Sequence, residues 1–282
     1  MVESTKGGLI ASDAEKEFEN PDVLFEKLKG LVKLVAKNLQ TSLIVSGGSG
    51  TGKTFTVIET LKEEGIQKDS GLILIGGGRI STFSLYQVLF RHRNKGQIIV
   101  FDNTDFMWRD KKATCILKSA LDTYDDGTIS FSRQRTVSWP SSITVDVSGM
   151  DAQQRKEVYD QLDKRNSDPK TSPKFPSEFE YEGGIIFITN IPINKLDRGV
   201  LDCSASIDTT LTVEQMFARM KSILPELGDK TVPSDVKEMI LQLLIDEYGK
   251  GAIKNVTLFT FIKAESIYQS GMSNWKELIM IC

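Results

Sequence analysis

A stretch of eight residues has the residue types and the spacing needed to bind a chain of phosphates. It fits the pattern G-x-x-x-x-G-K-S/T at every fixed position and reads Gly47-Gly48-Ser49-Gly50-Thr51-Gly52-Lys53-Thr54. Glycines let the backbone wrap closely around phosphates with its N–H groups pointing inward. Lys53 is expected to reach the β- and γ-phosphates of ATP, and Thr54 is expected to hold Mg²⁺. The alternative interpretation is a glycine-rich turn without a ligand.

The residues on either side of this loop favour the first interpretation. The apolar run 42–46 before the loop is typical of a short buried strand, and 55–62 after it is typical of a helix. The N-terminal end of such a helix carries partial positive charge, which attracts phosphate. A phosphate loop needs this order of strand, loop and helix.

Two further polar side chains end apolar runs downstream. Asp102 ends the run 97–102, and Asn190 ends the run 184–190. Open α/β sheets bind ligands at the carboxyl ends of their strands. We therefore expect Asp102 to hold Mg²⁺ through its shell and Asn190 to face the γ-phosphate and the attacking water. The alternatives are an aspartate that caps the next turn and an asparagine that closes a strand.

The residue after Asp102 bears on hydrolysis. It is Asn103, and an amide can align a water molecule but cannot accept its proton as a carboxylate can. Asp105 follows two places later. Either Asp105 accepts the proton, or hydrolysis is slow. Asp105 could equally be a solvated residue of a turn.

Composition limits the class of protein. The chain has 282 residues, 40% of them hydrophobic and 26% charged, as is typical of a soluble globular protein with one large domain or two. One histidine and three scattered cysteines argue against a zinc site or a histidine-based triad and favour the reducing cytoplasm. No run is apolar enough for a signal peptide or a membrane span. The net charge of −3, from 35 basic and 38 acidic residues, means that any nucleic-acid contact is local.

The predicted elements divide the chain into three parts. Residues 1–20 are polar and are expected to form a flexible N-terminus. Residues 21–210 alternate strands and helices, which predicts an α/β nucleotide-binding core with a parallel sheet of about five strands flanked by helices. Within this core, about 127–178 is predicted to be an insertion of a β-hairpin and a helix. Residues 211–282 are helical, which predicts a small α-helical C-terminal lid domain.

Apolar periodicity gives the expected bounds of these elements. The strands are expected at 42–46, 72–75, 97–102, 184–190 and 206–208. The core helices are expected at 21–39, 55–62, 81–93 and 111–123, and the lid helices at 213–224, 234–248, 260–270 and 274–281. Asn20 is expected to cap the first helix, and Thr212 with Gln215 fits a capping box.

These features together resemble an AAA+ P-loop ATPase. The resemblance is carried by the phosphate loop as Walker A, Asp102 as Walker B, Asn190 as sensor 1 and the helical lid. It covers roughly residues 20–272. The stretches 98–105 and 184–192 look most like the compact AAA+ ATPases that bacteriophages encode.

The resemblance implies an activity and partners. It implies ATP and Mg²⁺ bound between the core and the lid, and Mg-dependent ATP hydrolysis. It also implies a homo-oligomeric ring, commonly a hexamer, that remodels a polymer threaded through it. A phage-encoded member would act in the host cytoplasm.

Two segments depart from the AAA+ pattern. Where the family usually places an arginine finger, residues 200–206 contain no arginine, and Arg198 is the nearest substitute. The start of the third lid helix, 257–261, has no sensor-2 arginine, which leaves Lys263 and Arg219 as lid cations. Arg198 and Arg219 could equally be surface side chains. Because an arginine finger contributes several orders of magnitude to the rate, these losses predict weak hydrolysis or a subunit that uses ATP as a structural switch.

The predicted hairpin has a basic tip. Strands at 128–131 and 136–139 flank the segment 132–135, which carries Arg133 and Arg135. One large branch of AAA+ proteins has a hairpin at this place that points into the pore. Arg133 and Arg135 are therefore candidates for contact with the phosphate backbone of single-stranded DNA. The alternative, favoured by the negative net charge, is a surface hairpin with solvated arginines.

Three functions fit the sequence. The first is an ATPase that remodels DNA or a DNA-bound protein complex in phage replication, recombination or genome handling. The second is a protein-directed chaperone or assembly ATPase. The third is a nucleotide-gated scaffold with weak hydrolysis, which Asn103 and the missing arginines favour.

Overall fold

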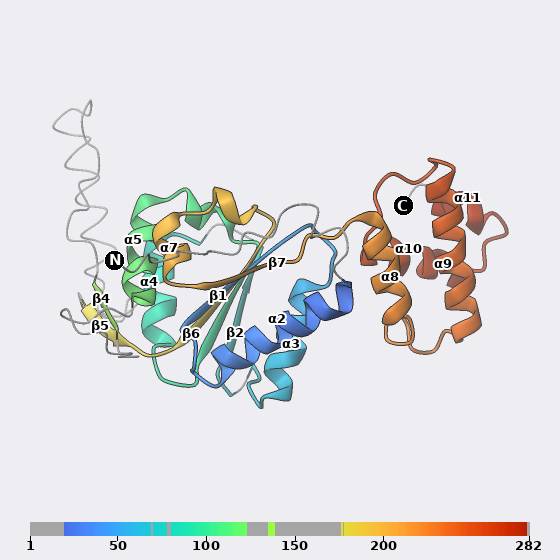
Figure 1. Cartoon of the computed structure of the whole chain (residues 1–282). Coiled ribbons are helices and arrows are strands. Elements are labelled where there is room, and N and C mark those ends of the chain that lie inside the picture. The colour runs from blue at the N-terminus through green and yellow to red at the C-terminus, as the bar shows by residue number, and fades with distance from the viewer. Residues whose placement is uncertain are drawn as a thin grey trace, which may run out of the picture.

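The chain folds into an α/β core and a helical C-terminal domain, which lie side by side in Figure 1. The computed structural model describes residues 20–68, 70–77, 80–122, 135–138, 176 and 178–280. Residues 1–19 and most of the predicted insertion at about 127–178 lie outside the described residues. The predicted fold class is confirmed, since a parallel sheet flanked by helices is followed by a domain of helices.

Five strands of the described residues form one parallel sheet in the order β2-β3-β6-β1-β7. Each agrees with its predicted range to within one residue at either end. The central strands are buried along almost their whole length, as their apolar sequences predict. The bounds are β1 Ser42–Ser46, β2 Leu72–Gly76, β3 Ile98–Asp102, β6 Gly184–Thr189 and β7 Ala205–Asp208.

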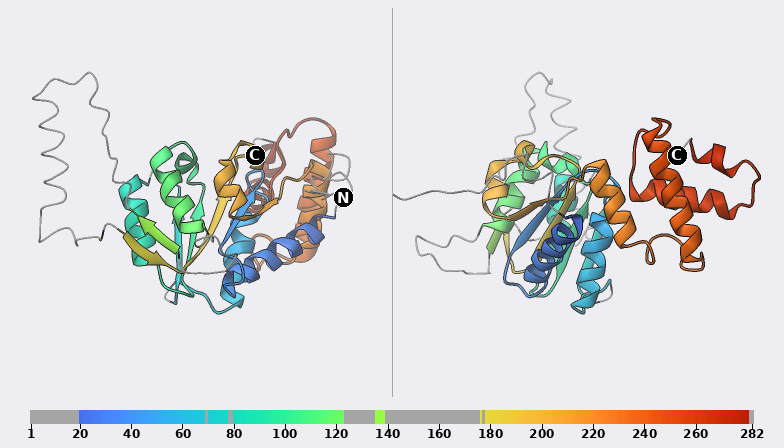
Figure 2. Two further views of the ribbon diagram at one scale, coloured as in Figure 1. Left: turned by 60° about the vertical axis from the view of Figure 1, so that its left-hand side comes forward. Right: turned by 45° about the vertical axis from the view of Figure 1, so that its right-hand side comes forward.

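Helices cover both faces of this sheet (Figures 1 and 2). Successive residues of a strand point to opposite faces, so β3 contributes Ile98 and Val100 to one core and Ile99 and Phe101 to the other. The first core contains α2 (Pro21–Ala36) and α3 (Lys53–Glu63). The second contains α4 (Thr82–Arg91), α5 (Lys111–Leu121) and the short α7 (Arg198–Asp202).

Helix α2 begins as predicted and ends earlier than predicted. The Asn20 side chain accepts a hydrogen bond from the Asp22 N–H at 2.9 Å, and Pro21 occupies the first helical position. The apolar repeat continues to Leu39, but the helix ends at Ala36 because Asn38 adopts a left-handed backbone with φ 56°.

The strand register brings the predicted site residues to one edge of the sheet. Ser46 at the end of β1 pairs with Thr189 at the end of β6, and Asp102 at the end of β3 pairs with Ile188 of β6. The phosphate loop follows β1, and Asn190 follows β6. Because β3, β6 and β1 are neighbours, the loop, Asp102 and Asn190 meet at the carboxyl edge.

The prediction that Arg135 lies at an exposed hairpin tip is wrong. Arg135 is in β4 (Arg135–Ser138), which pairs antiparallel with β5 (Glu178–Tyr181), and its side chain is buried. Its guanidinium donates hydrogen bonds to the carbonyls of Tyr181 at 3.2 Å and Gly183 at 2.6 Å. The predicted partner strand 128–131 and Arg133 lie outside the described residues.

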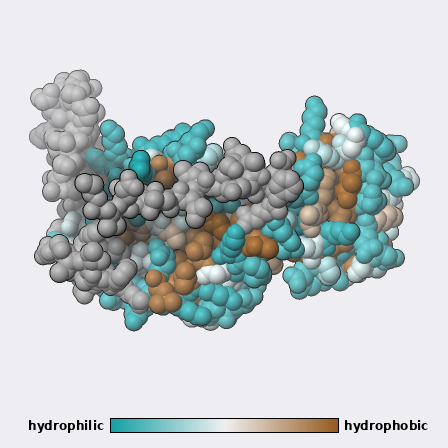
Figure 3. All heavy atoms as spheres, in the orientation of Figure 1, coloured by the Kyte–Doolittle hydropathy of each residue, from teal (hydrophilic) through white to brown (hydrophobic). Residues whose placement is uncertain are grey.

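The C-terminal domain is built from four helices in the described part of the chain, and the predicted capping box of Thr212 and Gln215 is present. Figure 3 shows hydrophobic side chains at its surface. Between α8 and α9, Phe217 and Tyr248 pack edge to face with ring centroids 5.8 Å apart. No helix among the described residues is long and apolar enough to cross a membrane. The helices are α8 Val213–Ser222, α9 Ser234–Gly249, α10 Leu258–Gln269 and α11 Trp275–Ile279.

An ion pair is buried inside this domain. Lys237 and Glu265 are 1% and 2% exposed, and their charged atoms are 3.9 Å apart. Lys237 donates to the Leu227 carbonyl at 2.6 Å, and Glu265 accepts from the Asp229 N–H at 2.7 Å. The pair therefore fixes the loop between α8 and α9 from within.

Removing one charge of this pair should destabilise the protein. Lys237→Met leaves the Glu265 carboxylate buried without its counter-charge, so we expect the free energy of unfolding to fall by about 3 kcal/mol. The measurement is urea denaturation followed by circular dichroism. The matched control is Lys254→Met at an exposed position, which should change the free energy by less than about 0.5 kcal/mol. Equal effects of the two variants would contradict the prediction.

Candidate nucleotide-binding site

The phosphate loop leads directly into helix α3. Gly52 is the N-cap of α3 with φ 95°, a conformation that favours glycine, and Lys53 is the first helical residue. Gly52 has no side chain that could cap the helix, so the first N–H groups of α3 are left for a ligand. The loop and the helix start thus have the form of an anion site.

Lys53 lies at the centre of the site with its ammonium buried. Its side chain is 5% exposed and donates to the carbonyls of Gly47 at 2.8 Å and Gly48 at 2.6 Å, and to the Asn190 amide oxygen at 3.2 Å. Burial lowers the pKa of Lys53 to about 8, although the charges of nearby carboxylates such as Asp102 oppose this effect. A bound phosphate would supply the negative charge that these neutral partners lack.

Thr54 and Asp102 form the pair that would hold Mg²⁺. The Thr54 hydroxyl donates to Asp102 Oδ2 at 3.0 Å, so both oxygens lie on the same side of the pocket. Magnesium prefers oxygen ligands and takes only one or two from the protein beside substrate phosphates. The donor set fits this ion, and among the described residues no cluster of three His, Cys, Asp or Glu offers another metal site. When bound, Mg²⁺ would neutralise charge on the β- and γ-phosphates.

Two asparagine amides connect these groups. Asn190 donates to Asn103 Oδ1 at 2.9 Å, and Asn103 donates to Asp102 Oδ1 at 3.1 Å. Asn103 has a left-handed backbone with φ 52°, and its N–H bonds the Ile188 carbonyl at 2.9 Å. A continuous chain of hydrogen bonds therefore runs from Lys53 through the two amides to Asp102.

Asp105 lies outside this chain. It is the first residue of a short 3₁₀ helix, Asp105–Trp108, and its Oδ1 accepts a hydrogen bond from the Thr189 hydroxyl at 2.6 Å. Thr189 in turn accepts from the Ile191 N–H at 3.0 Å. Asp105 thus fastens the end of β6 and does not line the pocket.

The pocket at this edge has a volume of about 340 Å³ and takes walls from the core and the lid. Sequence reasoning missed Phe55, Leu258 and Phe259, which line it. Phe55 directly follows the loop and could have been found from that position. Leu258 and Phe259 lie in the segment 257–261, where the AAA+ pattern predicts a sensor-2 arginine. The described pocket residues are Ser49, Gly50, Thr51, Gly52, Lys53, Thr54, Phe55, Asp102, Asn103, Ile188, Asn190, Leu258 and Phe259.

The candidate lid cation Arg219 is engaged elsewhere. Its guanidinium bonds Asp22 of α2 at 2.7 Å and lies over the Phe25 ring, 4.4 Å from the centroid. Burial works to raise the pKa of Asp22, but hydrogen bonds from Ser222 and Arg219 lower it below its ordinary value. Arg219 therefore joins the lid to the core, away from the described pocket residues.

The other two candidate cations are exposed. Arg198 is the first residue of α7, and Lys263 lies on α10. Neither lines the described pocket. Within one chain, Lys53 is the cation that the described pocket contains.

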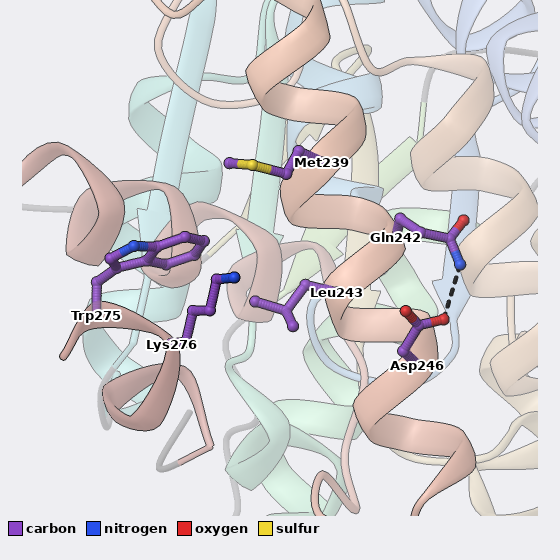
Figure 4. Close-up of a pocket in the computed structure, with 6 residues that line it drawn as sticks. All are labelled: Met239, Gln242, Leu243, Asp246, Trp275 and Lys276. Atoms are coloured by element: carbon purple, nitrogen blue, oxygen red, sulfur yellow. Dashed lines mark hydrogen bonds between the residues drawn. The ribbon is translucent and has the colours of Figure 1, made fainter. Parts of the chain in front are cut away.

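A second pocket of about 280 Å³ lies on the lid between α9 and α11 (Figure 4). Met239 and Leu243 face Trp275 and Lys276 across it, and Gln242 donates to Asp246 at 2.8 Å. It shares no residue with the phosphate-loop pocket.

No protein-family model matches the chain. A protein of Enterobacteria phage T4, described as an uncharacterized 36.7 kDa protein in the nrdC-mobD intergenic region, is 24% identical over 253 residues. The match covers 84% of this chain and 66% of the phage protein, so the chain spans just under two thirds of that relative.

Two similar solved structures are AAA+ proteins. One is the RuvB Holliday junction branch migration motor of Thermotoga maritima, 12% identical, with a TM-score of 0.48 over 92% of this chain and 68% of that chain. The other is the FIGL-1 AAA domain, 13% identical, with a TM-score of 0.41 over 88% of this chain and 71% of that chain. At these identities the likeness concerns the fold alone.

Replacing Lys53 should stabilise the nucleotide-free protein and at the same time abolish nucleotide binding. A lowered pKa means that a buried ammonium costs folding free energy near neutral pH. Lys53→Met should therefore raise the free energy of unfolding of the nucleotide-free protein by about 1 kcal/mol. The same change should abolish stabilisation by ATP with Mg²⁺.

Thermal unfolding with and without nucleotide measures both effects. The matched control is Lys62→Met, at an exposed position on the same helix, which should keep the response to nucleotide. A nucleotide-free Lys53→Met protein that unfolds more easily than the wild type would contradict the stability argument.

Proposed function

We propose that this chain binds ATP with Mg²⁺ and hydrolyses it slowly, as an AAA+ ATPase. One observation carries the proposal: Lys53, Thr54, Asp102 and Asn190 converge on one pocket at the carboxyl edge of the sheet. Lys53 would bind the β- and γ-phosphates, Thr54 and Asp102 would hold Mg²⁺, and Asn190 would face the γ-phosphate.

The positions of the carboxylates near the pocket support the proposed slow rate of ATP hydrolysis. Asp102 is the carboxylate among the described pocket residues, and it is assigned to the metal. Asp105 is bound to Thr189 outside the pocket, and Asn103 carries an amide. An amide aligns water without accepting its proton. The geometry thus favours slow hydrolysis over the alternative in which Asp105 is the base.

We further propose that the active form is a homo-oligomeric ring, for which a hexamer is the first candidate. The described pocket holds a single cation, Lys53, whereas phosphoryl transfer is greatly accelerated by a second. Arg198 is exposed at the start of α7 and is the candidate to act on the site of a neighbouring copy.

We propose that the ATPase acts on DNA or a DNA-bound protein complex, in phage replication, recombination or genome handling. The phage T4 relative supports a phage origin and therefore the host cytoplasm as the compartment. Because Arg135 is buried, Arg133 is the hairpin arginine that remains a candidate for DNA contact. Protein remodelling is the alternative.

Placing a carboxylate next to Asp102 should raise the rate of ATP hydrolysis. Asn103→Asp supplies a proton acceptor at the pocket, and aspartate tolerates the left-handed backbone of this position. We expect kcat to rise about tenfold or more. Asp105→Asn, which keeps a hydrogen-bond acceptor for Thr189, should leave kcat within about twofold.

Steady-state phosphate release with Mg·ATP gives both rates, and Lys53→Met measures the background. A loss of turnover in Asp105→Asn, with no gain in Asn103→Asp, would identify Asp105 as the base and overturn the assignment.

A DNA-directed role predicts that single-stranded DNA stimulates turnover. We expect stimulation in the wild type and a weaker response in Arg133→Ala, because one phosphate contact per subunit is lost. The control is Arg91→Ala, a helix-end residue of α4 outside the predicted hairpin. Stimulation by an unfolded polypeptide and not by DNA would favour the protein-directed alternative.

A further inference from the structure

The start of helix α10 lies directly against the phosphate loop. The Leu258 N–H donates a hydrogen bond to the Gly50 carbonyl at 2.9 Å. A Cβ added at Gly50 would lie 2.7 Å from Cβ of Thr257, and one added at Gly52 would lie 3.1 Å from Cδ1 of Leu258. The lid and the loop are therefore in contact with no room for another side chain between them.

Two N–H donors of the first turn of α10, those of Leu258 and Thr260, are used within the protein. The Leu258 N–H bonds Gly50, and the Thr260 N–H bonds the Thr257 hydroxyl at 3.3 Å. The Thr260 hydroxyl accepts in turn from the Thr257 N–H at 3.1 Å. While these bonds hold, these two N–H groups are not available to a phosphate, and one of them joins the lid to the loop backbone.

Lid cations do not contribute to the described pocket. Arg219 is paired with Asp22, and Lys263 is exposed on α10. The lid supplies Leu258 and Phe259 to the pocket, both of them uncharged. The groups placed to meet a third phosphate, Lys53 and Asn190, belong to the core.

We propose that the lid responds to occupation of the phosphate loop and not to the third phosphate of the nucleotide. Leu258 is then a positioning residue, whose N–H acts through the Gly50 carbonyl. Phosphates bound by the loop N–H groups would polarise its peptides and strengthen the Gly50 carbonyl as an acceptor. Because ADP fills the same loop as ATP, both should hold the lid in one position. This inference rests on the proposed nucleotide binding.

The test is the distance between the core and the lid, measured by electron–electron double resonance on the full chain. One spin label is placed on the exposed Cys115 of α5 and the other on Lys263→Cys, in a background of Cys203→Ala and Cys282→Ala. Mg·ADP and the non-hydrolysable analogue Mg·AMP-PNP should narrow the distance distribution to the same mean. A shift with Mg·AMP-PNP alone would overturn the proposal.

A glycine pair supplies matched variants. Gly50→Ala should abolish the narrowing because its Cβ would collide with Thr257, whereas Gly30→Ala on α2 should retain it because a Cβ there would meet nothing within 4 Å. Adding Thr257→Gly to Gly50→Ala should restore the response by removing the colliding atom. Since the strain of an alanine at φ 71° persists in the double variant, restoration would report the lid contact itself. Identical behaviour of Gly50→Ala and Gly30→Ala would refute that contact.

Titration of the same samples with a fluorescent nucleotide distinguishes a failure of this inference from a failure of the proposed function. Binding of a fluorescent ADP without any change in the lid distance would overturn this inference and leave the proposed function standing. A wild-type protein that binds neither nucleotide would overturn the proposed function, and the inference would fall with it.

Discussion

A lysine ammonium buried among neutral dipoles is the interaction on which the site depends. The partners of Lys53 are the Gly47 and Gly48 carbonyls and the Asn190 amide, and none of these neutralises its charge. Burial of an unneutralised ammonium costs free energy, as its lowered pKa indicates. Apolar packing of α3 against the sheet offsets that cost. The folded protein thus holds in place a positive charge that a bound phosphate chain can neutralise.

The remaining parts of the site are arranged around this charge by backbone geometry. Parallel pairing brings Asp102 and Asn190 to the same edge as the loop. The lid contacts the loop through the Leu258 N–H, which donates to the Gly50 carbonyl. Its second connection, from Arg219 to Asp22, also lies near the loop, because Phe25 under Arg219 is 4.0 Å from a Cβ placed at Gly52. The first connection therefore meets the nucleotide pocket through the backbone, whereas the second joins the charged side chains of Arg219 and Asp22 outside the described pocket residues.

The features that can be predicted from the sequence are those that local patterns of residues determine. Strand bounds, the loop and the ends of β3 and β6 follow from apolar runs and residue types, so the fold and the polar residues of the pocket could be predicted. Contacts between distant segments could not. Local patterns predict a tip position for Arg135 because none of them reveals its pairing with Tyr181, which is 46 residues away. The pairing of Arg219 with Asp22 spans 197 residues, and the apolar lid wall at Leu258 carries no motif.

The backbone of Asn103 connects this geometry with the proposed slow hydrolysis. Its left-handed conformation, φ 52°, suits asparagine better than glutamate. Its amide donates to Asp102 and accepts from Asn190, and a carboxylate could do only the second. A carboxylate here would also set two negative charges side by side until a metal bound. Asparagine therefore stabilises the nucleotide-free edge of the sheet, and the same amide leaves the site without a proton acceptor. In the proposed ATPase, slow turnover is thus a consequence of how the pocket is held together before ATP arrives.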